Sequence, residues 1–358
     1  MTVGLGAWNY PLVNAITKSG AALAFGNSMI YKPSELTPST TLELARIYIE
    51  AGVPDSVFSV LLGDGSVGRE LLQHDNNDNT TTSGIIQKVS MTGSVSTGQS
   101  VYSACATNLN SVTLELGGKS PLVICEDCDV HQAVAGAMLA NWYSNGQVCS
   151  NGTRVYVHED IADAFIETLV AKTKQMVIGP PLDDKTDIGP MISKQHMEHV
   201  LNYINIGKQD DGATLLHGGE RVLTSDTNGY YLSPAIFVDC TPNMRIVQEE
   251  VFGMLMTIQT YTSYDDVIQQ ANDSNYGLAA GIFTRDVQRA HNMAKRLDAG
   301  MVWINNYNIG LVQVPWSGFK QSGVGYENGI VGAETWTKVK SIHVEMDPIV
   351  NPYDKKES

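Results

Sequence analysis

The sequence predicts an α/β protein built on parallel sheets, and three observations support that prediction. Short apolar runs alternate with helical segments along most of the 358 residues, which is typical of βαβ crossovers. Glycine-containing turns follow several of these runs. The hydrophobic content of 43% is that of a globular chain, and the length corresponds to roughly two domains of about 150 residues each.

The first half of the chain begins with a predicted helix at 12–25. Pro11 suits the first helical position, and Gly26 suits the left-handed residue that ends a helix. The next elements alternate: strands are expected at 28–32, 57–62, 86–91 and 112–116, and helices at 39–51, 67–74 and 95–106. We expect the run at 57–62 to be buried. The polar, low-complexity stretch at 74–84 is interpreted as a surface loop.

A second α/β unit is predicted after Gly117 and Gly118. Its expected strands are 121–124, 154–157, 235–238, 278–283 and 302–304, and its expected helices are 130–143, 161–177, 264–272 and 287–297. The tail at 338–345 alternates polar and apolar residues like a strand that has no neighbour along the chain. Such a strand could pair with a sheet edge of another subunit.

Composition excludes several classes of protein. Lys and Arg number 23 against 38 Asp and Glu, a formal net charge of −15, whereas a nucleic-acid-binding protein would present a basic face. No apolar run approaches the ~20 residues of a membrane span. Five cysteines in a chain of this length do not make a disulfide scaffold, so we expect a protein of a reducing compartment, the cytoplasm.

Two glycine-containing turns are candidate phosphate sites. The segment 63–68 fits the G-x-G-x-x-G pattern of dinucleotide-binding loops, but it also fits an ordinary turn between a strand and a helix. Gly93 and Ser94 join a strand to a helix whose first N–H groups lack partners, so a pyrophosphate could bind there. Alternatively, Ser94 only caps that helix.

Lys32 and Glu35 follow another predicted strand. A Lys beside a Glu in a turn is usually a solvated pair. The two could instead hold a ribose diol, because an ammonium donates to its oxygens and a carboxylate accepts from them. Glu35 would then repel a ribose 2′-phosphate, which favours NAD over NADP.

Cys149 follows a helix and a turn that contains Gly146. A buried cysteine is more often an inert small residue than a nucleophile, so position alone does not decide its role. Cys125 and Cys128, with His131 nearby, resemble a metal knuckle. A single C-x-x-C pair is weak evidence for zinc, and we expect no metal site.

Two further kinds of site receive little support. His196 and His199 are three residues apart on a polar helix that we expect at the surface, without the spacing of a zinc-binding H-E-x-x-H motif. No serine lies in a G-x-S-x-G elbow, so serine-hydrolase chemistry is not indicated.

Taken together, these motifs resemble one family over nearly the whole chain, the NAD-dependent aldehyde dehydrogenases. The blocks are W-N-Y-P at 8–11, K-P-S-E at 32–35, T-G-S at 92–94, E-L-G-G-K at 115–119, G-Q-V-C at 146–149, E-E-V-F-G at 249–253 and S-G-F-K-Q-S-G at 317–323. Each block alone is weak, and the specificity lies in the ordered set. Within the family, segments 112–121, 283–286 and 304–308 are similar to betaine-aldehyde and trimethylaminobutyraldehyde dehydrogenases.

The resemblance implies a role for each matching residue. Cys149 would be the nucleophile, Glu115 the general base and Asn9 a donor to the oxyanion. Lys18 and Glu327 match positions proposed to relay protons from the base. Cofactor contacts are implied at Trp8, Lys32, Glu35, Gly93, Ser94, Thr97, Glu250 and Phe252, and an aromatic substrate tunnel at Tyr10, Tyr143 and Trp316.

The implied reaction is oxidation of an aldehyde to a carboxylic acid with NAD and without a metal. A thiolate adds to the aldehyde, hydride leaves the tetrahedral carbon, and the resulting thioester is hydrolysed. An amino- or trimethylammonium-aldehyde is the expected substrate, because a quaternary ammonium is held by aromatic faces at ~0.5–2 kcal/mol per ring. Two alternatives stay open: a catalytically silent structural or binding protein on the same fold, and a thioester or ester hydrolase that uses Cys149 and Glu115 without cofactor.

The resemblance also implies an organisation of the chain. It places an incomplete Rossmann-type NAD-binding domain at 1–117, a catalytic domain at 118–319, and a return segment with an oligomerisation strand at 320–358. Family members carry a long segment ahead of the W-N-Y-P block, so we expect this chain to be N-terminally truncated relative to them. The expected assembly is a homodimer or homotetramer, with a small aldehyde as the other partner.

Overall fold

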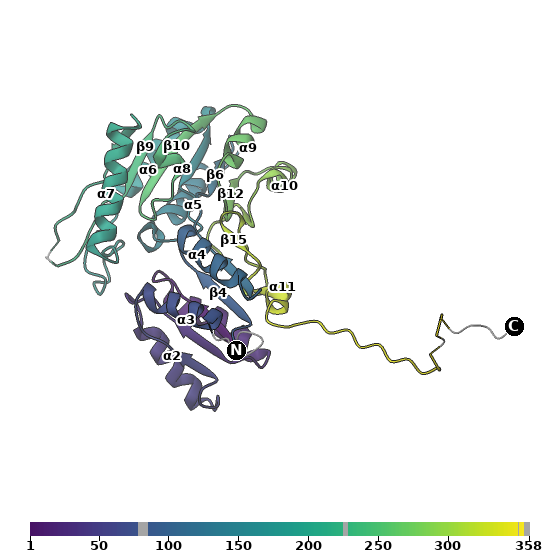
Figure 1. The fold of residues 1–358 in the computed structure, drawn as a ribbon. Helices are drawn as coiled ribbons and strands as arrows, with labels where there is room; N and C mark the ends of the chain where they lie inside the picture. The colour runs from purple at the N-terminus through teal and green to yellow at the C-terminus, as the bar shows by residue number, and fades with distance from the viewer. Residues whose placement is uncertain (78–84, 225–227, 350, 354–358) are drawn as a thin grey trace.

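The computed structural model describes residues 1–77, 85–224, 228–349 and 351–353. The described strands form a six-stranded sheet, a seven-stranded sheet and a two-stranded ribbon. Figure 1 shows the two large sheets in two lobes, with helices on their outer faces. The predicted α/β class with parallel strands is confirmed.

The six-stranded sheet has the strand order β15-β5-β4-β1-β2-β3. Five of its strands are parallel: β1 (Thr2–Leu5), β2 (Met29–Lys32), β3 (Phe58–Val60), β4 (Lys88–Thr92) and β5 (Ser111–Glu115). The short strand β15 (Gly323–Val324) comes from the far end of the chain and pairs antiparallel with β5. The connecting helices are α1 (Pro11–Ala24), α2 (Ser39–Glu50), α3 (Gly65–Asn77) and α4 (Val95–Ala106).

The seven-stranded sheet has the order β13-β12-β6-β7-β10-β9-β8. Its strands are β6 (Pro121–Ile124), β7 (Arg154–His158), β8 (Thr214–His217), β9 (Ala235–Val238), β10 (Leu255–Tyr261), β12 (Ala279–Phe283) and β13 (Met301–Ile304). Its helices are α5 (Val130–Trp142), the 3₁₀ turn η1 (Tyr143–Gly146), α6 (Glu159–Thr173), α7 (Lys194–Gln209), α8 (Arg245–Gln248), α9 (Tyr264–Asn272) and α10 (Val287–Arg296). The ribbon pairs β11 (Tyr276–Gly277) with β14 (Phe319–Lys320), and α11 (Gly329–Glu334) follows β15.

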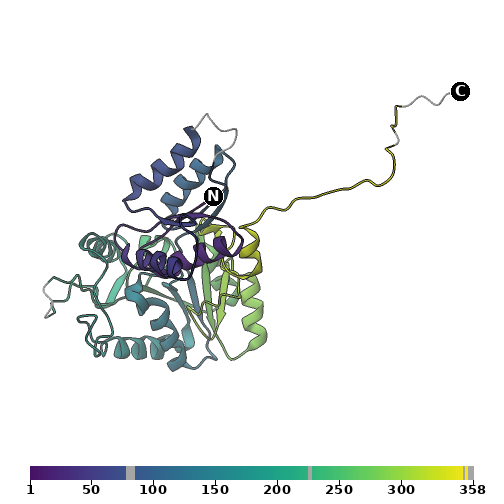
Figure 2. The same ribbon diagram turned by 90° about the horizontal axis from the view of Figure 1, so that it is seen from below.

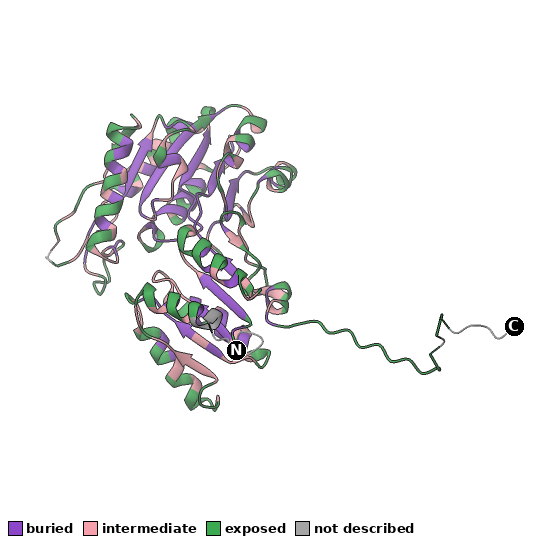
Figure 3. Cartoon of the chain, in the orientation of Figure 1, coloured by how far each residue is buried: buried purple, intermediate pink, exposed green. Residues whose placement is uncertain are grey.

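The apolar core lies along the central strands of both sheets. Leu122, Val123 and Ile124 of β6 are fully buried, as are Val155 and Val157 of β7. Figure 3 shows the buried residues gathered on the strands and the exposed residues on the outer helix faces. This pattern is expected for parallel strands that are covered on both sides.

Ser322, which lies between β14 and β15, joins the first sheet to the two-stranded ribbon. Its carbonyl accepts a hydrogen bond from the Leu116 N–H at 2.9 Å, and its hydroxyl donates to the Gly117 carbonyl at 2.7 Å. The same hydroxyl accepts from the Gly277 N–H of β11 at 2.9 Å. The end of β5, the return segment and the ribbon therefore meet at one buried serine.

Most predicted helices and strands form within two or three residues of their expected bounds, but several expectations were wrong. Strand β1 and the seven-residue strand β10 were not predicted. Strand β3 is only half-buried, because it lies at the sheet edge. Helix α3 continues to Asn77, into the stretch expected to be a loop, and 78–84 lie outside the described residues.

The tail does not form a strand within this chain. Residues 338–349 have no regular secondary structure, and their side chains are exposed. Figures 1 and 2 show this segment running away from the body of the molecule in both views. Its predicted pairing with another subunit stays a prediction, as does the division of the chain into three domains.

Candidate functional site

A cavity of about 310 Å³ lies where the carboxyl ends of the first sheet face the second sheet. Its lining includes eight of the predicted site residues: Trp8, Asn9, Gly93, Ser94, Glu115, Cys149, Glu250 and Phe252. These residues come from positions spread along most of the chain. The fold therefore brings the predicted nucleophile, base and oxyanion donor into one cavity.

The loop that carries Cys149 has an unusual backbone. After α5 ends, Ser144, Asn145 and Gly146 all have positive φ angles, of 52°, 57° and 70°. Asn145 is held there by its side-chain amide, which donates to the Gly189 and Pro190 carbonyls at 2.9 and 2.8 Å. Gly146 has no room for a side chain, since a Cβ would lie 2.3 Å from the Gly253 carbonyl carbon. This strained turn presents the partly exposed Cys149 to the cavity.

Glu115 is the last residue of β5, at the edge of the sheet where functional groups of parallel sheets gather. Its carboxylate accepts a hydrogen bond from the Cys149 thiol and another from the Trp316 indole at 3.3 Å. Gly118 permits this approach, because a Cβ there would lie 2.6 Å from the Cys149 carbonyl oxygen. Burial raises the pKa of Glu115 to about 7, which is suitable for a base at neutral pH.

The Cys149 thiol is protonated at neutral pH. Burial raises its pKa well above the ordinary value, and the Glu115 and Glu250 carboxylates add to the effect. Because the thiolate is the reactive form, this cysteine needs a base to take its proton. Glu115, which already accepts the hydrogen bond from the thiol, is in position to do so.

Asn9 lies just ahead of α1 and is half-buried. Its side-chain amide donates to the Gln147 carbonyl at 3.0 Å, which fixes the side chain beside the cysteine loop. An amide NH₂ has a second hydrogen. That second donor and the Cys149 backbone N–H are the two groups expected to bind an oxyanion.

Glu250, Phe252 and Trp8 line another wall of the same cavity. The Gly118 N–H donates to a Glu250 carboxylate oxygen at 3.1 Å, and burial raises the pKa of Glu250 to about 7. Phe252 has a φ angle of 57°, a strained conformation for an aromatic residue. Its ring meets the Trp8 ring edge-on, with 5.3 Å between centroids.

A second cavity, of about 470 Å³, adjoins the first through Thr92, which lines both. It contains Lys32 and Thr97 from the predicted cofactor set, with Gly65 and Gly68 of the glycine-rich turn. Glu35 lies beside it, with a carboxylate oxygen 4.0 Å from the Lys32 ammonium. The Ser94 hydroxyl caps α4 by accepting from the Thr97 N–H at 3.3 Å, so the capping interpretation of Ser94 is correct whether or not a ligand also binds.

These two cavities fit the dinucleotide that the resemblance implies. Gly6, Gly65 and Gly68 line the second cavity, which lets a ligand approach the backbone closely. The amino end of α4 supplies N–H groups for a diphosphate, and Lys32 and Glu35 suit a ribose diol. Trp8, Glu250 and Phe252 would hold the other end beside Cys149.

Lys18 and Glu327 form a buried ion pair behind Glu115. The Lys18 ammonium lies 2.5 Å from a Glu327 carboxylate oxygen and donates to the Thr92 hydroxyl at 2.8 Å. Lys18 is completely buried, and the Glu327 side chain is 14% exposed. The two predicted relay residues therefore contact each other and reach the strand beside Glu115.

The three predicted tunnel aromatics do not line the cavity that contains Cys149, in the part of the chain described. Tyr10 hydrogen-bonds Ser144 and Tyr143 through its hydroxyl. Burial raises the pKa of Tyr10 to about 12, and the nearby Cys149 adds to the rise. Tyr143 is exposed. Trp316 instead contacts Glu115, a role that the sequence did not suggest.

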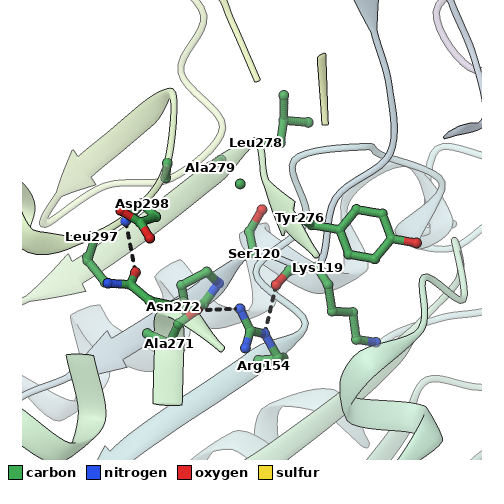
Figure 4. A pocket seen from close by; sticks show the side chains of 13 residues that line it. Lys119, Ser120, Arg154, Ala271, Asn272, Tyr276, Leu278, Ala279, Leu297 and Asp298 are labelled. Carbon is green, nitrogen blue, oxygen red and sulfur yellow. Dashed lines mark hydrogen bonds between the residues drawn. The ribbon is translucent and has the colours of Figure 1, made fainter. Parts of the chain in front are cut away.

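Arg154 supports the segment that follows Glu115. Its guanidinium is buried and donates to the Lys119 and Ala271 carbonyls, both at 2.7 Å, and to the Gln270 carbonyl at 3.2 Å. Figure 4 shows it in a small pocket, with the Lys119 side chain directed away from it. Burial lowers the pKa of Lys119 to about 7, and the Lys119 charge in turn lowers the pKa of Glu250. Lys119 ends the E-L-G-G-K block but was assigned no role there, and no sequence pattern pointed to Arg154.

The histidine helix is less peripheral than expected. His199 is exposed but lines the Cys149 cavity. The His196 ring is half-buried. Its Nε2 lies 2.7 Å from the Phe252 carbonyl oxygen, and the ring meets the Trp8 ring edge-on with 5.2 Å between centroids. His196 contacts Trp8 of the W-N-Y-P block, which is far away in the sequence. The spacing of residues along the chain could therefore not predict that this helix borders the cavity.

Two features are absent from the residues that the structure describes. No group of three or more His, Cys, Asp or Glu side chains in these ranges is arranged to hold a metal ion. None of the helices in the described part of the chain is both long and apolar enough to cross a bilayer.

The sequence is similar to those of named aldehyde dehydrogenases. The profile of the aldehyde dehydrogenase family matches residues 1–342. A betaine aldehyde dehydrogenase of Mesorhizobium japonicum is 49% identical over 352 residues, which are 98% of this chain and 70% of that protein. A betaine aldehyde dehydrogenase of Brucella anthropi is 45% identical over 351 residues, with the same coverage of 98% and 70%.

The fold is also similar to those of solved aldehyde dehydrogenase structures. Betaine aldehyde dehydrogenase from Staphylococcus aureus in complex with NAD⁺ superposes with a TM-score of 0.94 at 37% identity, over 99% of this chain and 69% of that one. The NAD⁺ complex of aldehyde dehydrogenase from Bacillus cereus gives a TM-score of 0.91 at 40% identity, over 97% and 68% of the two chains.

Proposed function

Because the chain belongs to the aldehyde dehydrogenase family, we propose that it oxidises an aldehyde to a carboxylic acid with NAD. One observation carries the proposal: the Cys149 thiol donates to the Glu115 carboxylate in a cavity that Asn9 also lines. A nucleophile, a base and an oxyanion donor within one cavity are what thiol addition to a carbonyl requires.

In the first step, Glu115 takes the thiol proton, and the Cys149 sulfur bonds to the aldehyde carbon. The carbonyl oxygen becomes an oxyanion, which the Asn9 amide and the Cys149 N–H would stabilise. Losing one such donor typically costs on the order of 3–4 kcal/mol of transition-state stabilisation. The Gln147 carbonyl, which holds Asn9, keeps that donor oriented before substrate arrives.

When bound, the nicotinamide of NAD supplies the acceptor for the hydride that leaves the aldehyde carbon. The Cys149 thioester that remains is hydrolysed by water. Glu115 first releases the thiol proton and then acts a second time as a base, taking a proton from that water while the Cys149 thiolate leaves. Such general-base assistance is usually worth ~10²–10⁴ in rate. Glu250 and Phe252 would hold the cofactor against the cysteine during the first half of this cycle.

The proposal is tested by adding NAD and an aldehyde to the purified protein and following NADH. Cys149→Ala is expected to abolish NADH formation, and Cys128→Ala, which changes a partly buried cysteine outside the site, is the matched control. Equal NADH formation by Cys149→Ala and the control would refute the proposal. Ester hydrolysis without any NADH signal would favour the cofactor-free hydrolase instead.

We further propose that the substrate is a trimethylammonium aldehyde such as betaine aldehyde. The named relatives support this, and Tyr10 lies beside the cysteine loop, where its ring could face a quaternary ammonium. A suitable comparison is 3,3-dimethylbutanal, which has the shape of betaine aldehyde but no charge. Tyr10→Leu is expected to lower the kcat/KM for betaine aldehyde roughly 2- to 30-fold relative to the neutral analogue. Tyr10→Phe keeps the ring and is the control; equal losses on both aldehydes would argue against the cage.

We also propose a homo-oligomer in a reducing compartment such as the cytoplasm. The exposed apolar side chains of the tail support the homo-oligomer. The five cysteines are all free thiols, which supports a reducing compartment.

A further inference from the structure

A row of buried polar side chains leads away from Glu115 along the first sheet. Strands β4 and β5 run side by side, with Thr92 opposite Glu115 and Ser90 opposite Thr113. Residues two apart on a strand share a face of the sheet, so Thr92, Ser90 and Lys88 lie on one side of β4. Thr113 and Glu115 lie on the same side of β5.

Hydrogen bonds link neighbouring members within two parts of this row. Lys18 bridges Thr92 and Glu327, as described above. The Ser90 hydroxyl donates to the same Glu327 oxygen at 3.2 Å. The Lys88 ammonium donates to the Thr113 hydroxyl at 2.6 Å, level with Ser90 on the neighbouring strand.

The row is enclosed until it reaches Lys88. Ser90 is fully buried and Lys88 is 4% exposed, with its ammonium 4.9 Å from the centroid of the Trp336 ring. The next residue, Gln87, is exposed, and its side-chain oxygen accepts from the exposed Lys338 at 2.6 Å. Lys88 is therefore the last buried polar side chain of the row at this end of the sheet.

The proposed reaction needs such a route. Each thioester hydrolysis leaves a proton on Glu115, which is 6% exposed, and the carboxylic acid must lose that proton before the next cycle. Burial raises the pKa of Glu115 to about 7, and the Glu327 carboxylate adds to the rise. The acid form of Glu115 therefore persists near neutral pH until a neighbouring group takes its proton.

We propose that Lys88 is the outer group of a proton exit that starts at Glu115 and runs through Lys18, Glu327, Ser90 and Thr113. The inference rests on the proposed function. Lys88 touches neither substrate nor cofactor and acts through Glu327, so it is a positioning residue of the relay.

Each step moves one proton and no electrons. The Glu115 acid gives its proton to the Lys18–Glu327 pair, Glu327 passes one through the Ser90 and Thr113 hydroxyls to the neutral Lys88 amine, and the Lys88 ammonium releases one to water. Burial lowers the pKa of Lys88 to about 8, so the neutral amine is available near neutral pH. The charged groups that bear on Lys88 are Glu327, which raises this pKa, and Lys18, which lowers it.

The test compares steady-state turnover of Lys88→Met, Lys88→Arg and Lys338→Met in dilute buffer. Arginine keeps the positive charge but does not deprotonate, so a merely electrostatic role would survive in Lys88→Arg and a relay would not. We expect both Lys88 variants to lose roughly 10- to 100-fold in kcat. Imidazole buffer should restore their turnover, while the exposed Lys338→Met should behave like the unchanged protein.

Ser90→Ala provides a second variant that keeps Lys88 and interrupts the link to Glu327. It should show the same dependence on imidazole. Wild-type turnover by Lys88→Arg in dilute buffer, or a loss in any of these variants that imidazole does not relieve, would overturn the proposal. Failure of the proposed function is distinguishable, since the unchanged protein would then form no NADH at all, whereas failure of the relay alone leaves its NADH formation intact.

Discussion

At Glu115, the end of β5 fixes the position of the base, and burial fixes its pKa. The carboxylate sits at the end of β5 with the Cys149 thiol and the Trp316 indole as donors. Desolvation raises its pKa, and these two donors oppose the rise without cancelling it. The same residue can therefore take a proton from the thiol and later from water near neutral pH.

This balance predicts the pH dependence of turnover. Only ionised Glu115 accepts a proton, so kcat should rise with pH through about 7 and fall about tenfold per pH unit below that value. Trp316→Phe removes a donor that lowers the Glu115 pKa, so the midpoint should move to higher pH. A kcat profile whose midpoint is unchanged in Trp316→Phe would contradict this assignment.

Replacing the base should slow both halves of the reaction. In Glu115→Gln neither the Cys149 thiol nor the hydrolytic water can give its proton to this carboxylate, and steady-state NADH formation should fall by roughly 10²–10⁴. A matched control is Glu334→Gln, which changes an exposed carboxylate in α11. Stopped-flow measurement of NADH checks this, and turnover of Glu115→Gln at the control rate would exclude Glu115 as the base.

Motifs locate Cys149, Glu115 and Asn9 along the chain, but not their surroundings. The Trp316 donor lies 201 residues from Glu115, and the Lys18–Glu327 pair joins residues 309 apart. Such contacts depend on how two sheets meet, which local spacing does not encode. For the same reason Trp316 was predicted only as a tunnel aromatic, while its indole also holds the base.

Among the elements, the turn after α5 decides whether the cysteine faces the cavity. Three successive residues with positive φ angles reverse the chain, and Gly146 packs its Cα against the Gly253 backbone. The sequence signalled this turn only through Gly146. Ser144 adopts the left-handed conformation without being glycine, at the expense of strain that the packing around it supports.

Gly146→Ala should therefore damage both stability and activity. A left-handed alanine costs about 1–3 kcal/mol, and its Cβ would also collide with Gly253, displacing Cys149 and lowering kcat/KM roughly 10- to 100-fold. Gly26→Ala is the matched control, because Gly26 has a φ of 73° but no atom within 4 Å of an added Cβ. Denaturant unfolding and NADH assays compare the two variants. Equal activity in both would show that the turn does not position the cysteine.

Helices and strands with simple patterns were predictable, and those with mixed patterns were not. Strands β6 and β9 formed at their expected residues because they are continuous apolar runs. Strand β10 was missed because Thr257 and Gln259 interrupt its apolar residues, although both are buried in the sheet. Strand β3 was expected in the interior because of its sequence, but its place at the sheet edge depends on strand order.

In the whole molecule, the exposed apolar side chains of the tail are the feature that contacts within one chain do not explain. Val339, Ile342, Val344 and Met346 are largely exposed on a segment that runs away from the body (Figure 1). A second copy of the chain offers sheet edges on which such a segment could pair. This is the physical basis for the proposed oligomer.

Charges on the apolar side of the tail should disrupt that oligomer. The double change Ile342→Asp and Val344→Asp is expected to give a smaller species, because an aspartate on a paired apolar face would lose its hydration. His343→Asp lies on the opposite side of the alternating segment and should leave the mass unchanged. Light scattering during gel filtration measures the mass, and an identical mass for both variants would mean that the tail is not the contact.

The proposed mechanism requires a covalent bond between the Cys149 sulfur and the aldehyde carbon, and trapping that bond tests the mechanism itself. Glu115→Gln, incubated with NAD and betaine aldehyde at a pH high enough to ionise part of Cys149 without the base, then quenched in acid and digested, should yield the Cys149 peptide with the mass of the acyl group added. Cys149→Ser in the same background should yield no such thioester. An unmodified Cys149 peptide from a protein that has formed NADH would contradict the account.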